Sequence, residues 1–128
     1  MKSIFGIGTD IVDISRFKKI FNKNKRFKDR IFSIKEIRYC ESKKNKISSF
    51  AKRFAAKEAF VKALGTGISK GISFNEILIN NNNNGAPFIE LLGKTKIIAK
   101  NLTKTKSKIY LSLSDEKKYA LAMVVISQ

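Results

Sequence analysis

The stretch RFAAKEAFVKALGTG, from Arg53 to Gly67, decides the fold of this chain. Its alanines favour a helix and its apolar residues recur at helical spacing, so we expect an amphipathic helix that ends at the glycines after Leu64. Glu58 lies at the edge of the apolar face instead of toward open water. We therefore expect its carboxylate to have a partner elsewhere in the chain.

The segment IFGIGTDIV, residues 4–12, alternates like a strand. One face would carry Phe5, Ile7, Thr9 and Ile11, and the other Gly6, Gly8 and Asp10. Glycine within a strand marks the close approach of a ligand or another backbone, so Asp10 beside two glycines indicates an open polar floor. A bulge or bend that carries an ordinary aspartate explains the same residues.

Three cations surround Glu58 on the expected helix, namely Arg53, Lys57 and Lys62. If Asp10 and Glu58 meet, their carboxylates repel one another unless a cation compensates. Magnesium binds one or two carboxylates together with water and substrate phosphates, and it would leave the flanking cations free to hold phosphate. The plainer alternative is an exposed i,i+4 ion pair between Glu58 and Lys62, worth about 0.3–0.5 kcal/mol, with the other cations solvated.

The composition limits the class of protein. With 128 residues, 43% of them hydrophobic, we expect one folded domain over residues 1–128. The N-terminus has no signal-peptide pattern and no apolar run could span a bilayer, so we expect a cytoplasmic protein without membrane insertion. Cys40 is the single cysteine and is interpreted as a core residue, and the absence of histidine removes the usual base of a catalytic triad.

The net charge of +17 favours a polyanionic partner, although AT-rich coding also produces many lysines. One basic stripe has the spacing of a helix face: Arg16, Lys19, Lys23 and Arg26. It would suit an acidic partner helix if the helix over 14–22 continues that far, and it is otherwise a solvated face.

The remaining patterns predict short helices and strands. Ser33 and Glu36 have the spacing of a capping box, and the central helix should begin near Ser48 or Ser49. A further helix is expected over 94–102, and strands over 72–80, 87–91, 108–114 and 119–126. The asparagine run between the first two of these strands is interpreted as an exposed polar turn.

Two motifs carry a family resemblance. GIGTDIVDISRF, from Gly6 to Phe17, and RFAAKEAFVKALGTGIS, from Arg53 to Ser69, closely resemble the signature regions of holo-acyl-carrier-protein synthase, the small bacterial phosphopantetheinyl transferase. The resemblance continues through RFKDRIFS, SFNEILI, NGAPFIEL and LSLSDEKKYALAMVVI. It implies an α+β fold, with an antiparallel sheet packed against a long central helix, and a homotrimer with active sites between adjacent subunits.

The implied reaction moves 4′-phosphopantetheine from coenzyme A to a serine of apo acyl carrier protein, an acidic partner, and releases adenosine 3′,5′-bisphosphate. It serves fatty acid biosynthesis. By matching positions, Asp10 and Glu58 would be the catalytic magnesium ligands. The same matching assigns coenzyme A contacts to Arg53, Lys57, Lys62, Gly65, Thr66 and Gly67, although a helix C-cap also explains the glycines. It also implies that Arg16 and the other residues of the basic stripe, Lys19, Lys23 and Arg26, contact the acidic helix of the carrier protein.

The sequence departs from the family at one point. Family members commonly carry histidines in an H-x-S-[IL]-[ST]-H segment, where this chain has Tyr110 and Asp115. The serine proton would then pass to a metal-bound water, which we favour, to Glu58, or to a carboxylate such as Asp115. The missing histidines keep open a noncatalytic carrier-binding relative. A small basic nucleic-acid-binding domain explains the charge but leaves Asp10 and Glu58 without a role.

Overall fold

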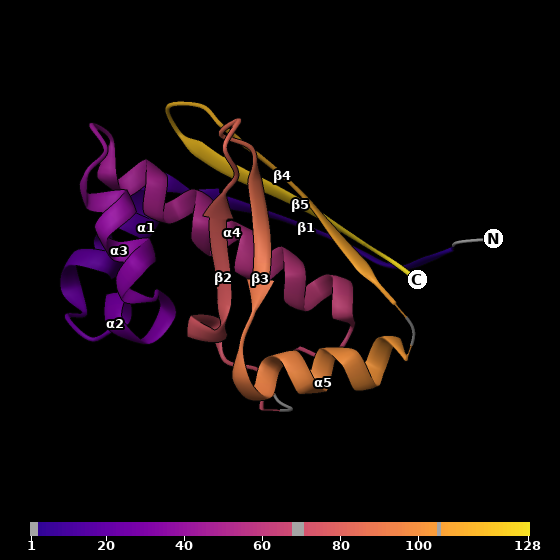
Figure 1. The fold of residues 1–128 in the computed structure, drawn as a ribbon. Coiled ribbons are helices and arrows are strands. Elements are labelled where there is room, and N and C mark those ends of the chain that lie inside the picture. The colour runs from indigo at the N-terminus through magenta and orange to yellow at the C-terminus, as the bar shows by residue number, and fades with distance from the viewer. Residues whose placement is uncertain (1–2, 68–70, 105) are drawn as a thin grey trace.

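The central helix lies between two antiparallel sheets. The computed structural model describes residues 3–67, 71–104 and 106–128, and its longest element is helix α4, Lys46–Leu64. A three-stranded sheet covers one side of α4 and a two-stranded hairpin covers another (Figure 1). This arrangement confirms the expected α+β fold, in which antiparallel strands pack against a long central helix.

The other elements surround α4 (Figure 1). In chain order they are β1 (Ile4–Asp13), α1 (Ile14–Lys23), α2 (Phe27–Ile31), α3 (Ile34–Glu41), then after α4 the 3-10 helix η2 (Phe74–Glu76), β2 (Ile77–Asn81), β3 (Pro87–Leu91), α5 (Gly93–Thr103), β4 (Lys108–Asp115) and β5 (Tyr119–Ser127). Helices α1–α3 gather at the N-terminal end of α4, and α5 lies beside its C-terminal half. None of the helices in the described part of the chain is long and apolar enough to cross a membrane.

The three-stranded sheet has the order β1-β5-β4, with both pairs antiparallel. Its inner face packs on α4, and Ala120 and Ala122 of β5 are fully buried there. Asp10 of β1 lies opposite Ala122 in the register. Because these alanines are small, this part of the sheet can approach the helix closely, whereas the larger Val124 and Ile126 fill the inner face further along β5.

Gly6 and Gly8 show how closely β1 approaches α4. A Cβ added to Gly6 would collide with the carbonyl oxygen of Ala63, and a Cβ added to Gly8 with that of Ala59. These are backbone atoms of a helix, so no rotamer change can move them aside. The open polar floor expected at these glycines is therefore wrong, because the backbone of α4 covers them, and its close approach is what requires glycine.

The outer face of the three-stranded sheet is apolar and exposed. Six large side chains on it are each more than 40% exposed: Ile7, Ile11, Tyr110, Tyr119, Leu121 and Met123. The alternation predicted for β1 correctly places Ile7 and Ile11 on this face. Phe5 differs from that prediction, because the register is irregular between Ile4 and Gly6 and Phe5 packs against the core.

A cluster of phenylalanines holds α1–α3 against the N-terminal half of α4. Phe32, which follows α2, packs on Phe50 of α4 with ring centroids 5.0 Å apart. The predicted capping box is confirmed, since Ser33 and Glu36 exchange both hydrogen bonds at the start of α3. Cys40 is completely buried as a core residue should be, and this burial raises the pKa of its thiol.

Two predicted boundaries are wrong. Helix α4 begins at Lys46, two to three residues early, because its hydrogen bonds begin at the carbonyl of Asn45. The strand expected over 72–80 begins only at Ile77, because Phe74–Glu76 form a 3-10 turn.

Candidate active site

The close packing of β1 on α4 brings Asp10 beside Glu58. Asp10 follows Gly8 by two residues and so shares its strand face, while Glu58 directly precedes Ala59, which Gly8 approaches. Burial raises the pKa of Glu58, the negative charge of Asp10 raises it further, and Lys62 lowers it. The structure therefore brings together the two carboxylates whose convergence the spacing left open.

Lys62 is the counter-ion of this pair. Its Nζ donates to Asp10 Oδ1 at 3.0 Å and to the Thr9 carbonyl oxygen at 2.9 Å. Within the described residues its ion pair is with Asp10, not with Glu58 as the i,i+4 spacing suggests. The Lys62 side chain is 55% exposed, and an ammonium has three donors, so one N–H remains for a ligand.

The segment from Gly65 to Gly67 follows directly after the helix turn that carries Lys62. Gly65 ends α4 with a left-handed φ of 79°, as a C-cap glycine does, and Gly67 has a φ of 64°. Among the described residues, apart from the immediate chain neighbours, no atom lies within 4 Å of a Cβ added at either glycine. Thr66 Oγ1 donates to the Gly67 carbonyl oxygen. Capping thus explains Gly65, and the open space also leaves room for a ligand. Residues 68 and 69, the end of the second motif, lie outside the described residues.

Arg53 lies on a different side of α4. It precedes Glu58 by five residues, which is about 140° around a helix. Its side chain is buried, its guanidinium lies 4.0 Å from the centre of the Tyr39 ring, and its Nη2 donates to Asn81 Oδ1 at 2.8 Å. Within the described residues its Nε is the one buried side-chain nitrogen or oxygen that has no hydrogen-bond partner. Arg53 and Glu58 therefore do not meet within one chain.

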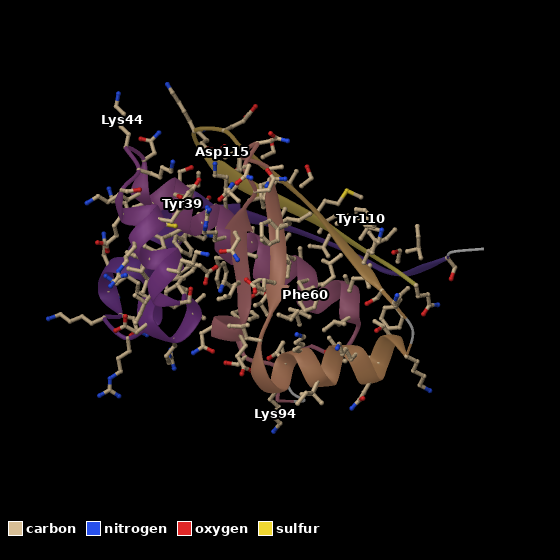
Figure 2. All side chains as sticks on the ribbon, viewed as in Figure 1. Tyr39, Lys44, Phe60, Lys94, Tyr110 and Asp115 are labelled. Atoms are coloured by element: carbon tan, nitrogen blue, oxygen red, sulfur yellow. The ribbon has the colours of Figure 1, made fainter. Side chains whose placement is uncertain are left out.

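A cationic cavity of about 480 Å³ adjoins Arg53. Lys44 and Lys52 line it together with one acid, Asp115. That acid is already engaged, because it accepts from Ser48 Oγ at 2.9 Å and pairs with Lys52 at 3.4 Å. Lys44 and Asp115 lie at the same end of the molecule (Figure 2). The cavity thus offers cations to a phosphate-bearing ligand.

Lys57 lies neither beside the two acids with Lys62 nor in the cationic cavity beside Arg53. Its ammonium is fully buried and donates to Glu36 Oε1 at 2.7 Å and to the carbonyl oxygens of Ile31 at 2.9 Å and Phe74 at 2.8 Å. These three acceptors use all three N–H groups. Lys57 therefore has no donor left for a phosphate, although the sequence groups it with the cations around Glu58.

Sequence reasoning missed the partners of Arg53. Tyr39 has no local pattern that indicates a contact with α4, and Asn81 belongs to the run interpreted as an exposed loop. Instead Asn81 ends β2, accepts from Arg53 and donates to the Gly85 carbonyl oxygen. The sequence identifies Glu36 only as a capping residue. Its ion pair with Lys57 has no local pattern, because the two residues are 21 positions apart.

The predicted basic stripe is shorter than expected. Arg16, Lys19 and Lys23 are exposed on one face of α1. Helix α1 ends at Lys23, and Arg26 occupies the N-cap of α2 instead. Arg26 therefore lies outside the helix that carries the other three.

Comparison with known proteins establishes the family. A sequence model of the 4′-phosphopantetheinyl transferase superfamily matches residues 6–124. This match covers the paired acids, the central helix and the three-stranded sheet, and it places the chain among the phosphopantetheinyl transferases.

Close relatives narrow the assignment. The holo-[acyl-carrier-protein] synthase of Buchnera aphidicola subsp. Schizaphis graminum is 48% identical over 127 residues, covering 98% of this chain and 99% of its own. That of Zymomonas mobilis is 47% identical over 128 residues, covering 96% of each chain. The chain belongs to the holo-acyl-carrier-protein synthase family, as the two motifs indicate.

Solved structures of the family share the fold. The holo-[acyl-carrier-protein] synthase of Neisseria meningitidis matches with a TM-score of 0.86 and 37% identity, over 97% of this chain and 98% of its own. The Bacillus anthracis enzyme, solved in complex with CoA (3′,5′-ADP), matches with a TM-score of 0.80 and 35% identity, over 98% of this chain and 97% of its own.

Proposed function

We propose that this chain transfers 4′-phosphopantetheine from coenzyme A to a serine of apo acyl carrier protein, releases adenosine 3′,5′-bisphosphate, and depends on magnesium. The observation that carries the proposal is the meeting of Asp10 and Glu58 where β1 packs on α4. Two adjacent, partly buried carboxylates with a single lysine counter-ion suit a divalent cation. Membership of the family favours the transferase over a nucleic-acid-binding domain or a noncatalytic carrier-binding protein.

The donor set fits magnesium better than a metal held by protein alone. Among the described residues, no three acidic, cysteine or histidine side chains gather as a metal cluster. Asp10 and Glu58 supply two carboxylates, and magnesium completes its octahedron with water and substrate phosphates. When bound, the metal would polarise the attacked β-phosphoryl group and neutralise charge on the leaving group.

The side chains around the acids serve the same transfer. Lys62 would use its free N–H to hold a phosphate oxygen, and the open backbone from Gly65 to Gly67 would lie beside the nucleotide. The serine oxygen bonds to the β-phosphorus while the bond to the bisphosphate leaving group breaks. A bound divalent cation would keep Glu58 ionised in spite of its burial and of Asp10, so we assign Glu58 to the metal and not to the serine proton. Asp115 is not assigned to the proton either, since Lys52 and Ser48 already engage it.

A complete site would need two subunits. Glu58 and Arg53 face different sides of α4, so one coenzyme A molecule would reach both only if neighbouring copies contribute one each. The exposed apolar face formed by β1, β5 and β4 supports such an assembly, because contiguous apolar surface of this kind marks interaction sites. We infer a homotrimer in which Arg53 and its cationic cavity complete the neighbour's Asp10–Glu58 pair.

The acidic carrier protein would dock on α1. Arg16, Lys19 and Lys23 form an exposed basic face on the helix that directly follows β1, and Arg16 lies six residues beyond Asp10. Complementary charge would speed the encounter and make it sensitive to salt. We propose that Arg26, at the N-cap of α2, lies at the edge of this docking surface.

The central test follows the mass of apo acyl carrier protein incubated with coenzyme A and magnesium. The wild-type chain should add one phosphopantetheine, and Glu58→Gln should stop this while retaining the wild-type circular dichroism. Glu41→Gln is the matched control, because Glu41 forms an exposed ion pair with Lys28 away from both acids. Unchanged turnover in Glu58→Gln would remove Glu58 from the site. Carrier binding without any mass increase in the wild type would favour the noncatalytic alternative.

Subunit mixing tests the shared site. At a coenzyme A concentration far below the KM of Arg53→Ala, Glu58→Gln and Arg53→Ala should each give little transfer as pure proteins. Unfolded together in equal amounts and refolded, they should recover about one quarter of wild-type transfer, because that fraction of interfaces pairs an intact Glu58 with a neighbour's intact Arg53. Mixtures that stay inactive, although they form mixed oligomers, would contradict a site built between subunits.

A further inference from the structure

Glu36 and Lys57 form a buried ion pair to which the proposed reaction gives no role. The Lys57 side chain is 0% exposed and that of Glu36 is 1% exposed, with 2.7 Å between Nζ and Oε1. Burying two charges costs several kcal/mol per ion unless geometry and further hydrogen bonds compensate. An apolar pair of similar volume would often serve stability equally well, so the charges require an explanation.

The hydrogen bonds of the pair join five elements from three separate stretches of the chain, α2 and α3, α4, and η2 and β2. Lys57 of α4 binds the carbonyl oxygen of Ile31, at the end of α2, and that of Phe74, in η2. Glu36 Oε1 also accepts from Ser33 N at the start of α3, and Oε2 accepts from Ile79 N of β2 at 3.0 Å. Since hydrogen bonds have defined lengths and directions, this cluster sets the spacing between α3, α4 and β2.

Arg53 depends on the same three elements. It precedes Lys57 by one helical turn on α4 and so lies on the same side of the helix. Its stacking partner Tyr39 follows Glu36 by three residues on α3, and its acceptor Asn81 follows Ile79 by two residues on β2. Figure 2 shows Tyr39 on the side of the helical cluster that faces β2. The contacts of Arg53 with Tyr39 and Asn81 thus lie within three residues of Glu36 and of its partner Ile79.

We propose that Glu36 and Lys57 are positioning residues for Arg53. They hold α3 and β2 at the separation at which Tyr39 and Asn81 together orient the guanidinium. This orientation leaves Arg53 Nε without a hydrogen-bond partner among the described residues, beside a cationic cavity. The inference rests on the proposed role of Arg53 in holding a phosphate of coenzyme A, and it gives Lys57 an indirect role in binding that ligand.

Glu36→Gln is the sharpest perturbation. The amide has nearly the shape of the carboxylate and its oxygen can still accept from Lys57 and Ser33, but its NH₂ group cannot accept from Ile79 N. We expect β2 to move and Arg53 to lose its geometry. The KM for coenzyme A should rise about tenfold, while kcat and the KM for carrier protein change less than about threefold. Lys57→Met, which removes the cation, is a second variant with the same expected pattern.

Side-chain NMR of Arg53 gives a readout that does not depend on activity. The Tyr39 ring should shift the resonances of the Arg53 side chain, because the guanidinium lies over the ring. This ring shift should shrink in Glu36→Gln and in Lys57→Met. A full ring shift in either folded variant would overturn the positioning role.

Ser33→Ala is the matched control. It removes the hydroxyl cap of α3, and so loosens the same helix, but it leaves the bonds from Glu36 to Lys57 and Ile79 in place. It should lower the thermal midpoint without changing the Arg53 ring shift or the KM for coenzyme A. An equal rise in KM in Ser33→Ala would show that general loosening, not positioning, is responsible.

Arg53→Ala separates this inference from the proposed function. If Glu36 acts through Arg53, the double variant Glu36→Gln/Arg53→Ala should have the same KM for coenzyme A as Arg53→Ala alone. A lost ring shift in Glu36→Gln, with an unchanged KM in Arg53→Ala, would support positioning and refute the ligand role of Arg53. Additive effects on KM would contradict action through Arg53.

Discussion

Replacing Gly8 by alanine tests whether backbone packing places the candidate metal site. The added Cβ would fall on the carbonyl oxygen of Ala59 and lie within 2.8 Å of the Ala63 nitrogen. Neither atom can rotate away, because both belong to the backbone of α4. Since normal contacts of a Cβ are longer than 3 Å, β1 must move from α4 by about 1 Å to accept the methyl group.

The expected losses of stability and of transfer rate follow from the displacement of β1, which carries Asp10. Overpacking of this kind typically costs about 1–3 kcal/mol of stability. Asp10 shares a strand face with Gly8 and must move with it, and a 1 Å displacement of a reacting group costs on the order of 100-fold in rate. We therefore expect Gly8→Ala to lose a modest part of its stability and nearly all of its transfer activity.

Two measurements and one control separate these effects. Urea unfolding gives the stability, and the mass increase of carrier protein gives the rate. Gly71→Ala is the control, because it forces a non-glycine residue to a φ of 85°, at about 1–2 kcal/mol, yet displaces only the end of the Lys94 side chain. It should lose comparable stability and retain transfer. Wild-type transfer in Gly8→Ala would refute the idea that this contact places Asp10.

Three further predictions concern other parts of the chain. Hydrogen bonds from Thr95 lower the pKa of Glu76. The ionised carboxylate therefore contributes its full stability to the fold above the ordinary pKa of 4.5, and this contribution is lost as the pH falls through the lowered pKa. Between about pH 6 and pH 3, the urea midpoint of Glu76→Gln should therefore fall less than that of the wild type. If the proposed homotrimer forms through the exposed sheet face, Leu121→Lys should sediment as a monomer and lose transfer, and an active monomer would contradict a shared site. Arg16→Glu with Lys23→Glu should raise the KM for carrier protein and reduce its salt dependence, whereas an effect confined to coenzyme A would contradict docking on α1.

The fold is predictable where the pattern is local and strongly periodic. The helix from Arg53 to Leu64 and the alternation of β1 follow from residue spacing, and the capping box at Ser33 and Glu36 is a four-residue signal. The 3-10 turn before β2 is not predictable in this way. Ile72 and Phe74 are both buried, so their spacing imitates a strand although the chain is turning.

The candidate site is predictable only in part, because its contacts are long-range. Asp10 and Glu58 are 48 positions apart, yet the glycines beside one and the alanines beside the other indicate that their backbones meet. The burial of Lys57 is not indicated by any comparable sequence pattern. Its three acceptors come from α2, α3 and η2, and none of these segments contains a pattern that points toward a buried ammonium.

The environment of α4 explains why its charged residues divide as they do. The helix is covered by the three-stranded sheet, the β2–β3 hairpin and the helices α1–α3, so charges on its covered faces, unlike that of the half-exposed Lys62, cannot simply be solvated. Each buried or partly buried charge must then find a partner inside the chain or outside it. Within the described residues, Lys57 finds three acceptors, whereas the buried Nε of Arg53 has no partner and Glu58 is repelled by the carboxylate of Asp10. The residues left unsatisfied by the fold are thus the ones to which a phosphate ligand and a divalent cation are assigned, and their opposed directions on one helix are why we infer that two subunits share each site.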